Sequence, residues 1–246
     1  MQKADYLASF KEEISKLVRP EDIKAQILEI NDDNLKLAGA QIREGKLVAF
    51  PTETVYGLGA NALDEAAVLN IFKTKGRPLT DPVIVHVNEV EHALELVELT
   101  ENEQELFLYL AKAFWPGPLT MVVRANPKKI SPVVTASTGF VGIRSPKHEI
   151  ARKLIKEADR PISAPSANLF SHVSPTSAVH VFNDFFNKEV SILNGDRSEF
   201  GMESTVVKVY ANESGELSLK VFRLGSLSEQ SLREELSKSE KFKRVP

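Results

Sequence analysis

One stretch limits the fold more than any other. Residues 47–61 read Leu-Val-Ala-Phe-Pro-Thr-Glu-Thr-Val-Tyr-Gly-Leu-Gly-Ala-Asn. The four apolar residues before Pro51 predict a strand buried on both faces, because a strand with one solvated face would alternate apolar and polar side chains. Gly57 and Gly59 then permit a tight turn or a close approach of the main chain to a ligand. A ligand site at the end of a buried strand and a ligand-free strand-to-helix turn fit this stretch equally well.

The common glycine patterns of nucleotide-binding loops are absent. A dinucleotide-binding loop needs a third glycine three residues after the second, but Ala60, Asn61 and Ala62 follow Gly59. The Gly-Lys-Ser/Thr sequence of a phosphate loop does not occur in the chain. A nucleotide, if it binds, must therefore bind through other contacts.

Composition limits the class of protein. A chain of 246 residues can form one large α/β domain or two small ones, and 42% hydrophobic with 26% charged residues is typical of a globular protein. The 31 basic and 34 acidic residues give a net charge of -3, which argues against wholesale coating of nucleic acid but permits a local basic cleft.

The absence of cysteine excludes disulfides, thiolate zinc sites and cysteine nucleophiles, and it fits a reducing compartment. No apolar run approaches the roughly 18 residues of a membrane span, and the charged N-terminus lacks a signal-peptide core. We expect a soluble, cytoplasmic protein.

Periodicity predicts helices and strands that alternate along the chain before a final hairpin, which favours a single α/β domain with a mixed sheet. In the helix that starts at Asp64, we expect Val68, Leu69, Ile71 and Phe72 to face inward. The predicted strands cover residues 26–30, 47–50, 82–87, 119–124, 140–144, a short segment near 162, 192–193, 205–210 and 217–223. The predicted helices cover residues 4–18, 32–43, 64–75, 90–99, 101–114, 148–158, a segment from 174 and a segment from 228, with a charged, frayed tail after Ser237.

Several polar residues have a structural and a functional interpretation. Lys73, Lys75 and Arg77 crowd the predicted end of a helix, where cations are favourable without binding anything. Arg77, however, precedes Pro78 and so belongs to an extended link. His86 lies within a predicted core strand, where a lone histidine is usually structural.

A set of short motifs resembles the YrdC family of threonylcarbamoyl-AMP synthases. Each motif is weak alone, but together and in this order they are specific, and they cover residues 25–230. The motifs are Pro-Thr-Glu-Thr-Val-Tyr-Gly-Leu-Gly (51–59), Lys-Gly-Arg-Pro (75–78), Pro-Val-Ile-Val-His (82–86), Trp-Pro-Gly-Pro-Leu-Thr (115–120), Gly-Ile-Arg (142–144), Ala-Pro-Ser-Ala-Asn (164–168), Ser-Pro-Thr (174–176) and Glu-Ser-Thr (203–205).

The resemblance implies a twisted mixed sheet with flanking helices and an open basic cleft. It divides the chain into an N-terminal helical extension (1–24), a catalytic domain (25–230) and a helix end with a charged tail (231–246). The implied enzyme is a nucleotidyltransferase that makes threonylcarbamoyl-AMP from L-threonine, bicarbonate and ATP and releases pyrophosphate. This is the first step of threonylcarbamoyladenosine modification of tRNA, so threonylcarbamoyl transferase proteins are the expected downstream partners.

The resemblance also implies a division of the site residues. Negative charge builds up on every reactant, so cations are required, and the planar fork of Arg144 suits a carboxylate or carbamate. Lys75 and Arg77 are the expected catalytic residues. The threonine and bicarbonate site is expected to contain Thr52, His86, Arg144 and Ser204. The ATP site is expected to contain Lys75, Arg77, Thr120, Ser166, Asn168, Ser174 and Arg223.

No protein-held metal site is expected. Mg²⁺ should arrive with ATP and be held mainly by phosphates and waters. Glu53 is equally interpretable as an outer-sphere partner of that ion or as a structural carboxylate.

The sequence departs from the family pattern in two places, and two alternative functions fit the same motifs. Residues 169–173, Leu-Phe-Ser-His-Val, replace a glycine-containing, more basic link, so the segment over ATP is expected to grip differently. The chain ends soon after Arg223, so we expect the short form of the family without an extra C-terminal domain. One alternative is a double-stranded RNA-binding module of the same fold, without synthase activity. Another is a carbamoyl transferase domain, but the larger proteins that contain it bring cysteines that are absent here.

Overall fold

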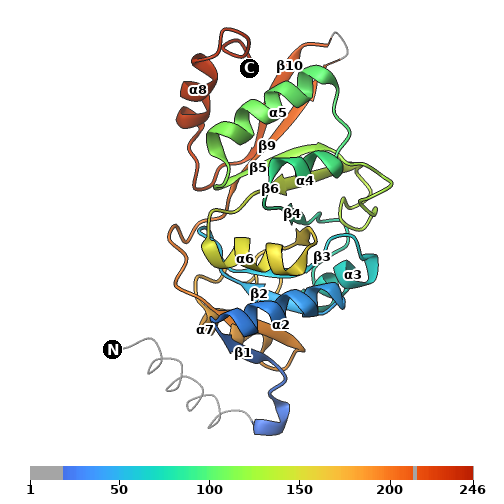
Figure 1. Cartoon of the computed structure of the whole chain (residues 1–246), viewed down its shortest axis with the longest axis vertical. Coiled ribbons are helices and arrows are strands. Elements are labelled where there is room, and N and C mark those ends of the chain that lie inside the picture. The colour runs from blue at the N-terminus through green and yellow to red at the C-terminus, as the bar shows by residue number, and fades with distance from the viewer. Residues whose placement is uncertain (1–18, 213–214, 246) are drawn as a thin grey trace.

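The structure is a computed structural model that describes residues 19–212 and 215–245; the helix predicted over residues 4–18 lies outside these ranges. Within them the strands form a 10-stranded sheet in the order β1-β8-β2-β3-β7-β4-β6-β5-β9-β10, which runs along the long axis of the molecule (Figure 1). The strands are β1 (Gln26–Glu29), β2 (Leu47–Phe50), β3 (Gly57–Asn61), β4 (Ile84–His86), β5 (Leu119–Arg124), β6 (Phe140–Arg144), β7 (Ile162–Ser163), β8 (Val190–Asn194), β9 (Thr205–Ala211) and β10 (Leu217–Arg223). The helices are η1 (Pro20–Asp22), α2 (Asp32–Arg43), α3 (Glu65–Lys75), α4 (Val90–Glu95), α5 (Glu101–Phe114), α6 (Glu149–Ala158), α7 (Ala178–Phe185) and α8 (Glu229–Ser237).

The sheet is mixed, as predicted. β8 pairs in parallel with both β1 and β2, whereas β3 pairs antiparallel with β2 and β7. In the other half, β6 lies parallel to β4 and antiparallel to β5, and β9 lies parallel to β5 and antiparallel to β10. The final antiparallel pair is the predicted hairpin.

Local sequence signals fix the helix ends. The Asp64 side chain accepts a hydrogen bond from the Ala67 amide at the start of α3, and Gly76 ends this helix with φ of 67° in the left-handed region that glycine favours. Thr100 and Glu103 form a capping box at the start of α5. At α2, Asp32 and Asp33 are the caps that the sequence favours, but the cap is Asn31, whose side chain accepts a hydrogen bond from the Asn34 amide.

The glycines of the 47–61 stretch lie in a strand, which corrects the predicted turn. Gly57 pairs with Phe50 and Gly59 with Val48 across the antiparallel β2 and β3. A Cβ on Gly59 would lie 2.8 Å from a ring atom of Phe50 and 2.9 Å from a methyl of Ile162. Glycine is therefore required here by the close packing of neighbouring strands, and the turn lies in residues 51–56.

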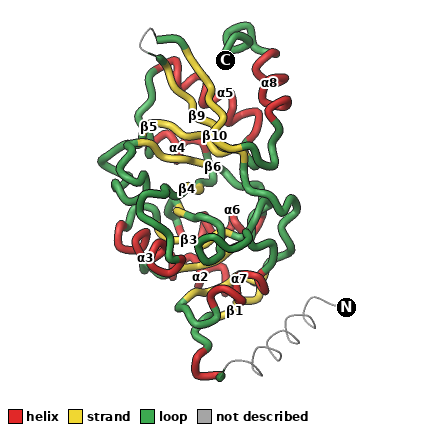
Figure 2. Tube along the Cα trace, turned by 180° about the vertical axis from the view of Figure 1, so that it is seen from behind, coloured by secondary structure: helices red, strands yellow, loops and turns green. Residues whose placement is uncertain are grey.

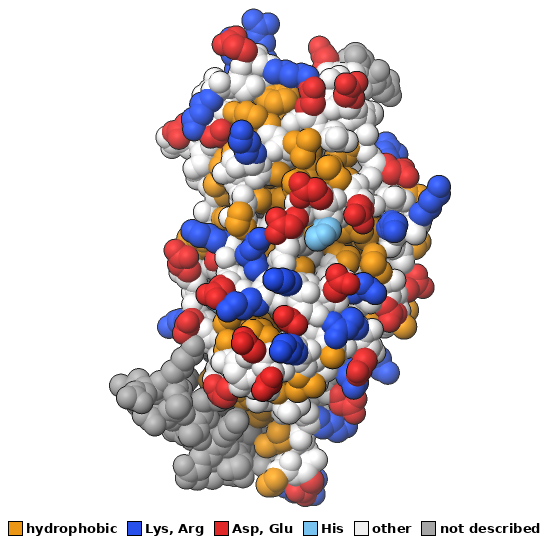
Figure 3. All heavy atoms as spheres, viewed as in Figure 1, with side chains coloured by type: hydrophobic (Ala, Val, Ile, Leu, Met, Phe, Trp, Pro, Cys, Tyr) orange, Lys and Arg blue, Asp and Glu red, His pale blue; other side chains and the backbone are white. Residues whose placement is uncertain are grey.

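The two halves of the sheet are covered differently. Around β8, β2 and β3, helices α2 and α6 pack on one face, and α3 and α7 pack on the other. Around β4, β6, β5 and β9, the helices α4, α5 and α8 cover one face. The opposite face of this half is seen without a covering helix in Figure 2. The helix-covered side in Figure 3 carries Lys and Arg side chains interspersed with Asp and Glu.

Two further predictions of burial were wrong. Leu69 is 38% exposed, because it lies at the border of the buried face of α3, which is centred on Val68 and Ile71. The segment after Ser237 is not a frayed tail: Phe242 is only 5% exposed, and its ring lies 5.1 Å from that of Tyr109 on α5.

Successive side chains along each strand lie on opposite faces of the sheet, and this alternation decides which residues reach the open face. In β5, the side chains of Leu119 and Met121 join the helix-covered core, whereas Thr120 and Val122 face the other way. The same period of two places His86 of β4 and Lys208 of β9 on the open face. Sequence periodicity thus brings polar residues from separate strands to one surface.

Candidate functional site

A cleft of about 520 Å³ lies on the open face of the sheet. Its floor consists of side chains from β4, β5, β6, β9 and β10, and its wall consists of the turns at 52–57, 77–83, 164–166 and 203–204. Gly142 keeps the floor low, because a Cβ there would lie 3.2 Å from the Thr120 methyl. Segments from almost the whole described chain therefore meet at one concave surface.

Most of the predicted site residues meet in this cleft. Three do not line it: Lys75, Asn168 and Ser174. The predicted residues that line it are Thr52, Arg77, His86, Thr120, Arg144, Ser166, Ser204 and Arg223.

Arg144 forms the buried inner end of the cleft. Its Nη2 lies 2.7 Å from the carboxylate of Glu53, and both side chains are almost fully buried. Its Nη1 donates to Thr54 Oγ1 at 2.9 Å, and its Nε donates to the main-chain oxygen of Gly117 at 3.1 Å. Burial lowers the pKa of Arg144, and the Glu53 carboxylate opposes that effect. Glu53 is thus a structural partner of Arg144 and does not itself line the cleft.

His86 is the neutral polar group at this end. Burial, with a further contribution from the Arg144 charge, lowers its pKa to about 3. Its ring lies edge-on to Phe50, and main-chain groups of Ile162 and Ile84 lie within its hydrogen-bonding reach. The imidazole therefore stays uncharged at neutral pH.

The turn before β3 organises its own hydroxyls. Thr52 Oγ1 donates to the main-chain oxygen of Val55 at 2.6 Å and accepts from the amides of Thr54 and Val55, both at 3.2 Å. Thr52 and Thr54 hydroxyls also lie 2.8 Å apart. This turn, closed on the Thr52 side chain, holds Thr54 against Arg144.

Lys75 supports the cleft wall without lining the cleft. Its Nζ donates to the main-chain oxygen of Ser166 at 2.6 Å and to both the main-chain and side-chain oxygens of Asn168. Burial, reinforced by the nearby Arg77 charge, lowers the pKa of Lys75 to about 7. The last residue of α3 therefore holds the turn that presents Ser166 to the cleft.

Arg77 is fixed by the loop that follows it. Its Nε donates to the main-chain oxygen of Asp81 at 3.0 Å, and Nη2 donates to that of Pro82 at 2.9 Å. Nη2 also lies 2.9 Å from the Asp81 carboxylate. Burial lowers the pKa of Arg77, whereas the Asp81 charge raises it. Arg77 thus enters the cleft with a carboxylate partner already in place.

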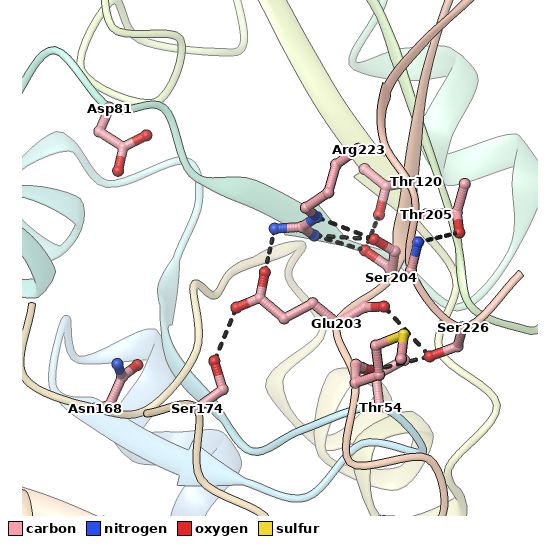
Figure 4. Close-up of polar contacts among 12 residues, drawn as sticks. Thr54, Asp81, Thr120, Asn168, Ser174, Glu203, Ser204, Thr205, Arg223 and Ser226 are labelled. Carbon is pink, nitrogen blue, oxygen red and sulfur yellow. Dashed lines mark hydrogen bonds and ion pairs between the residues drawn. The ribbon is translucent and has the colours of Figure 1, made fainter. Parts of the chain in front are cut away.

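A polar network connects β5 and β10 with the segment at 203–204 and with Ser174 (Figure 4). Thr120 Oγ1 and Ser204 Oγ lie 2.8 Å apart, and the Nε and Nη2 of Arg223 donate to the Ser204 main-chain oxygen at 3.2 and 3.0 Å. Glu203 pairs with Nη1 of Arg223 and accepts from Ser174 Oγ at 3.0 Å. Ser174, predicted to face ATP, is therefore connected to the cleft through Glu203.

Sequence reasoning missed several residues of the cleft. Asp81 stands four residues after Arg77, and Glu203 begins the Glu-Ser-Thr motif, but neither received a role from the sequence. Lys208 lies in the cleft with its Nζ 3.8 Å from the centre of the Phe140 ring. Strand alternation from Thr120, Val122 and Val206 was the signal that could have found Lys208.

The fold and site define a class of protein. Concave sites of several hundred Å³ with a few convergent polar groups typically bind small molecules. The cations of this cleft, Arg77, Arg144, Lys208 and Arg223, outnumber the carboxylates that line it, Asp81 and Glu203. The chain is an α/β protein with a small-molecule cleft suited to anionic ligands.

Comparisons with known proteins agree with this class. The family described as telomere recombination (Sua5, YciO and YrdC) matches residues 40–225, so the chain belongs to that family. Over 178 residues, 72% of this chain and 51% of the relative, it is 51% identical to a threonylcarbamoyl-AMP synthase of Pyrococcus abyssi. Over 73% of this chain and 51% of the relative, it is 46% identical to a threonylcarbamoyl-AMP synthase of Bacillus subtilis. The chain spans about half the length of these curated relatives.

A solved structure shares the fold closely. The crystal structure of P. abyssi Sua5 complexed with L-threonine superposes with a TM-score of 0.77 and 43% sequence identity, over 90% of this chain and 62% of that chain. The resemblance found from the sequence motifs is confirmed at the level of family and fold. No helix within residues 19–212 and 215–245 is long and apolar enough to cross a membrane.

Proposed function

We propose that the chain makes threonylcarbamoyl-AMP from L-threonine, bicarbonate and ATP and releases pyrophosphate, as a nucleotidyltransferase. The observation that carries the proposal is the convergence of motifs from separate parts of the chain on one cationic cleft. The relatives named threonylcarbamoyl-AMP synthase and the related structure with L-threonine support the same assignment.

The proposed chemistry has two steps. The threonine amine attacks the carbon of bicarbonate, and water leaves, which gives a carbamate. A carbamate oxygen then attacks the α-phosphorus of ATP, and pyrophosphate leaves. Holding the three reactants together supplies much of the rate, and cations stabilise the charge that develops on the phosphates.

The predicted site residues divide between the proposed substrates. We assign threonine and bicarbonate to Thr52, His86, Arg144 and Ser204. The neutral imidazole of His86 can accept or donate a hydrogen bond there without adding charge. We assign ATP to Arg77, Thr120, Ser166 and Arg223, with Lys75, Asn168 and Ser174 supporting them without lining the cleft.

Mg²⁺ fits this site only as an ion that ATP brings. Among the described residues no cluster of three or more His, Cys, Asp or Glu could hold a metal. The carboxylates that line the cleft, Asp81 and Glu203, each pair with an arginine. Mg²⁺ prefers phosphate oxygens and waters to such a setting, and when bound it neutralises charge on the triphosphate.

The double-stranded RNA alternative receives less support. An RNA-binding face needs a continuous array of cations for phosphates, but the cleft on the open face carries the carboxylates of Asp81 and Glu203 among its cations. The cleft arginines Arg77 and Arg223 already carry carboxylate partners. The product, a reactive adenylate, would pass to a threonylcarbamoyl transferase that acts on tRNA.

Release of pyrophosphate tests the proposal. We expect release only when ATP, threonine and bicarbonate are all present, because the carbamate must form before the α-phosphorus is attacked. R77A should lower the rate at least about a hundredfold through the loss of a charge contact to the triphosphate. The matched control is K73A, since Lys73 is an exposed cation of the same helix end and does not line the cleft.

Release from ATP alone, or equal release without bicarbonate, would contradict the proposed reaction. Near-normal turnover of R77A would remove Arg77 from the site. Salt-sensitive binding of double-stranded RNA without any pyrophosphate release would favour the RNA-binding alternative.

A further inference from the structure

Arg223 has no free nitrogen for a ligand in the observed arrangement. Its Nε and Nη2 donate to the Ser204 main-chain oxygen, and Nη2 also reaches Ser204 Oγ at 3.3 Å. Its Nη1 is paired with the carboxylate of Glu203. The remaining N–H of Nη1 lies beside the Glu203 carboxylate, so a phosphate that binds Arg223 there competes with Glu203 for the same nitrogen.

The second oxygen of Glu203 holds another predicted ligand of ATP. Ser174 Oγ donates to Glu203 Oε1 at 3.0 Å. The carboxylate thus bridges β10 to the segment that precedes α7, and Figure 4 shows it between these two elements. Its side chain lines the cleft and is 33% exposed, so a ligand can reach it.

The Glu203 charge also acts on the other cations of the site. Burial lowers the pKa of both Lys75 and Arg77, and the Glu203 carboxylate is among the charges that oppose this effect. Asp81 acts in the same way on Arg77. The negative charge of Glu203 therefore stabilises the charged forms of Lys75 and Arg77 as well as pairing with Arg223.

A carboxylate with one oxygen on an arginine and the other on a serine hydroxyl makes the contacts that two oxygens of a phosphate would make. We propose that Glu203 is a positioning residue, an internal anion that keeps Arg223 and Ser174 oriented and that a phosphate of ATP displaces. This inference rests on the proposed function, because it assumes that ATP binds in the cleft.

Displacement is energetically accessible. Both partners of the Glu203 and Arg223 pair are partly exposed, with 33% and 41% of their side-chain surfaces accessible. Such pairs stabilise by only about 0.2–1 kcal/mol, so removing the charge of Glu203 should tighten ATP binding by a factor of about 1.4 to 5. The gain depends on the phosphates, because the nucleoside carries no charge for Arg223.

The test compares E203Q with the unaltered protein in calorimetric titrations with ATP, AMP and adenosine. The glutamine side chain of this variant would keep a hydrogen-bond acceptor for Ser174 but lack the negative charge. We expect a lower Kd for ATP and AMP and an unchanged Kd for adenosine. The matched control is E199Q, which removes one exposed carboxylate from the same loop, outside the cleft lining, and should change none of the three. Thermal melts of both variants show whether each is folded.

The outcomes separate this inference from the proposed function. An unchanged or higher Kd for ATP in a folded E203Q overturns the internal-anion role while the proposed function stands. A gain that is equal for adenosine and ATP also overturns it, because a general loosening of the cleft would explain it. If the unaltered protein binds no ATP and releases no pyrophosphate, the proposed function fails and this inference fails with it.

Discussion

His86 shows how one buried side chain limits stability in acid. Its folded pKa of about 3 lies below the ordinary value of 6.5 because burial and the Arg144 charge both disfavour the imidazolium. Between these two values the unfolded chain binds a proton that the folded chain does not. The contribution of the neutral His86 to the free energy of unfolding is therefore fully present above pH 6.5, and it is lost as the pH falls from 6.5 toward 3.

The first prediction concerns H86Q, which cannot be protonated. Between pH 7.5 and pH 5, the unaltered protein should lose about 2 kcal/mol more unfolding free energy than H86Q, as measured by urea titration at each pH. The control H92Q changes an exposed histidine and should retain the acid sensitivity of the unaltered protein. Equal acid sensitivity of H86Q and the unaltered protein would show that His86 is not the titrating group.

Single residues also show where sequence reasoning succeeds and stops. Motif residues such as Arg144 and Ser204 were found, because their identity and order in the chain already mark them. Asp81 and Glu203, which pair with Arg77 and Arg223, were not assigned, since such a pair depends on which way each side chain turns. Lys75 is the clearest case: its contacts at Ser166 and Asn168 lie 91 and 93 residues away, so neither propensity nor periodicity indicates them.

At the scale of elements, β3 explains the main error in the secondary structure. Glycine permits backbone angles that other residues avoid, so Gly57 and Gly59 were interpreted as a tight turn or a close approach to a ligand. The neighbouring strands decide otherwise, because the ring of Phe50 and the side chain of Ile162 fill the space above Gly59. The C-terminal segment was misread for a similar reason: its charged residues mark solvent exposure, whereas the single Phe242 packs into the core. Tertiary packing overrides local propensity in both places.

The second prediction tests this packing with G59A. The added methyl would meet Phe50, Ile162 and the Val48 main-chain oxygen at 2.8, 2.9 and 3.1 Å. Overpacking of this kind typically costs about 1–3 kcal/mol, so the urea midpoint should fall. G142A is the comparison, since its nearest contact is 3.2 Å and it faces the cleft; it should lose less stability. An unaltered midpoint in G59A would show that the strands can separate locally.

At the scale of the whole molecule, a single sheet joins two halves. One half has helices on both faces, and the other has helices on one face and the cleft on the opposite face. β3 pairs with β7, and β7 pairs with β4, so hydrogen bonding continues from one half to the other. The lining of the cleft begins at Thr52 and ends at Arg223, which means that both halves must be folded before the site exists. Binding and global folding should therefore be coupled.

The third prediction follows from this coupling. Thermal and urea unfolding should show one transition in both circular dichroism and tryptophan fluorescence; the fluorescence reports the one tryptophan, Trp115. The proposed function implies that ATP at a hundred times its Kd stabilises the whole fold by about 2.7 kcal/mol, because the cleft exists only in the folded chain. At the same ATP concentration R77A should gain less, since its affinity is lower. Two separate transitions, or an ATP effect on only one of the two probes, would mean that the halves fold independently, and the cleft could then open without unfolding of the sheet.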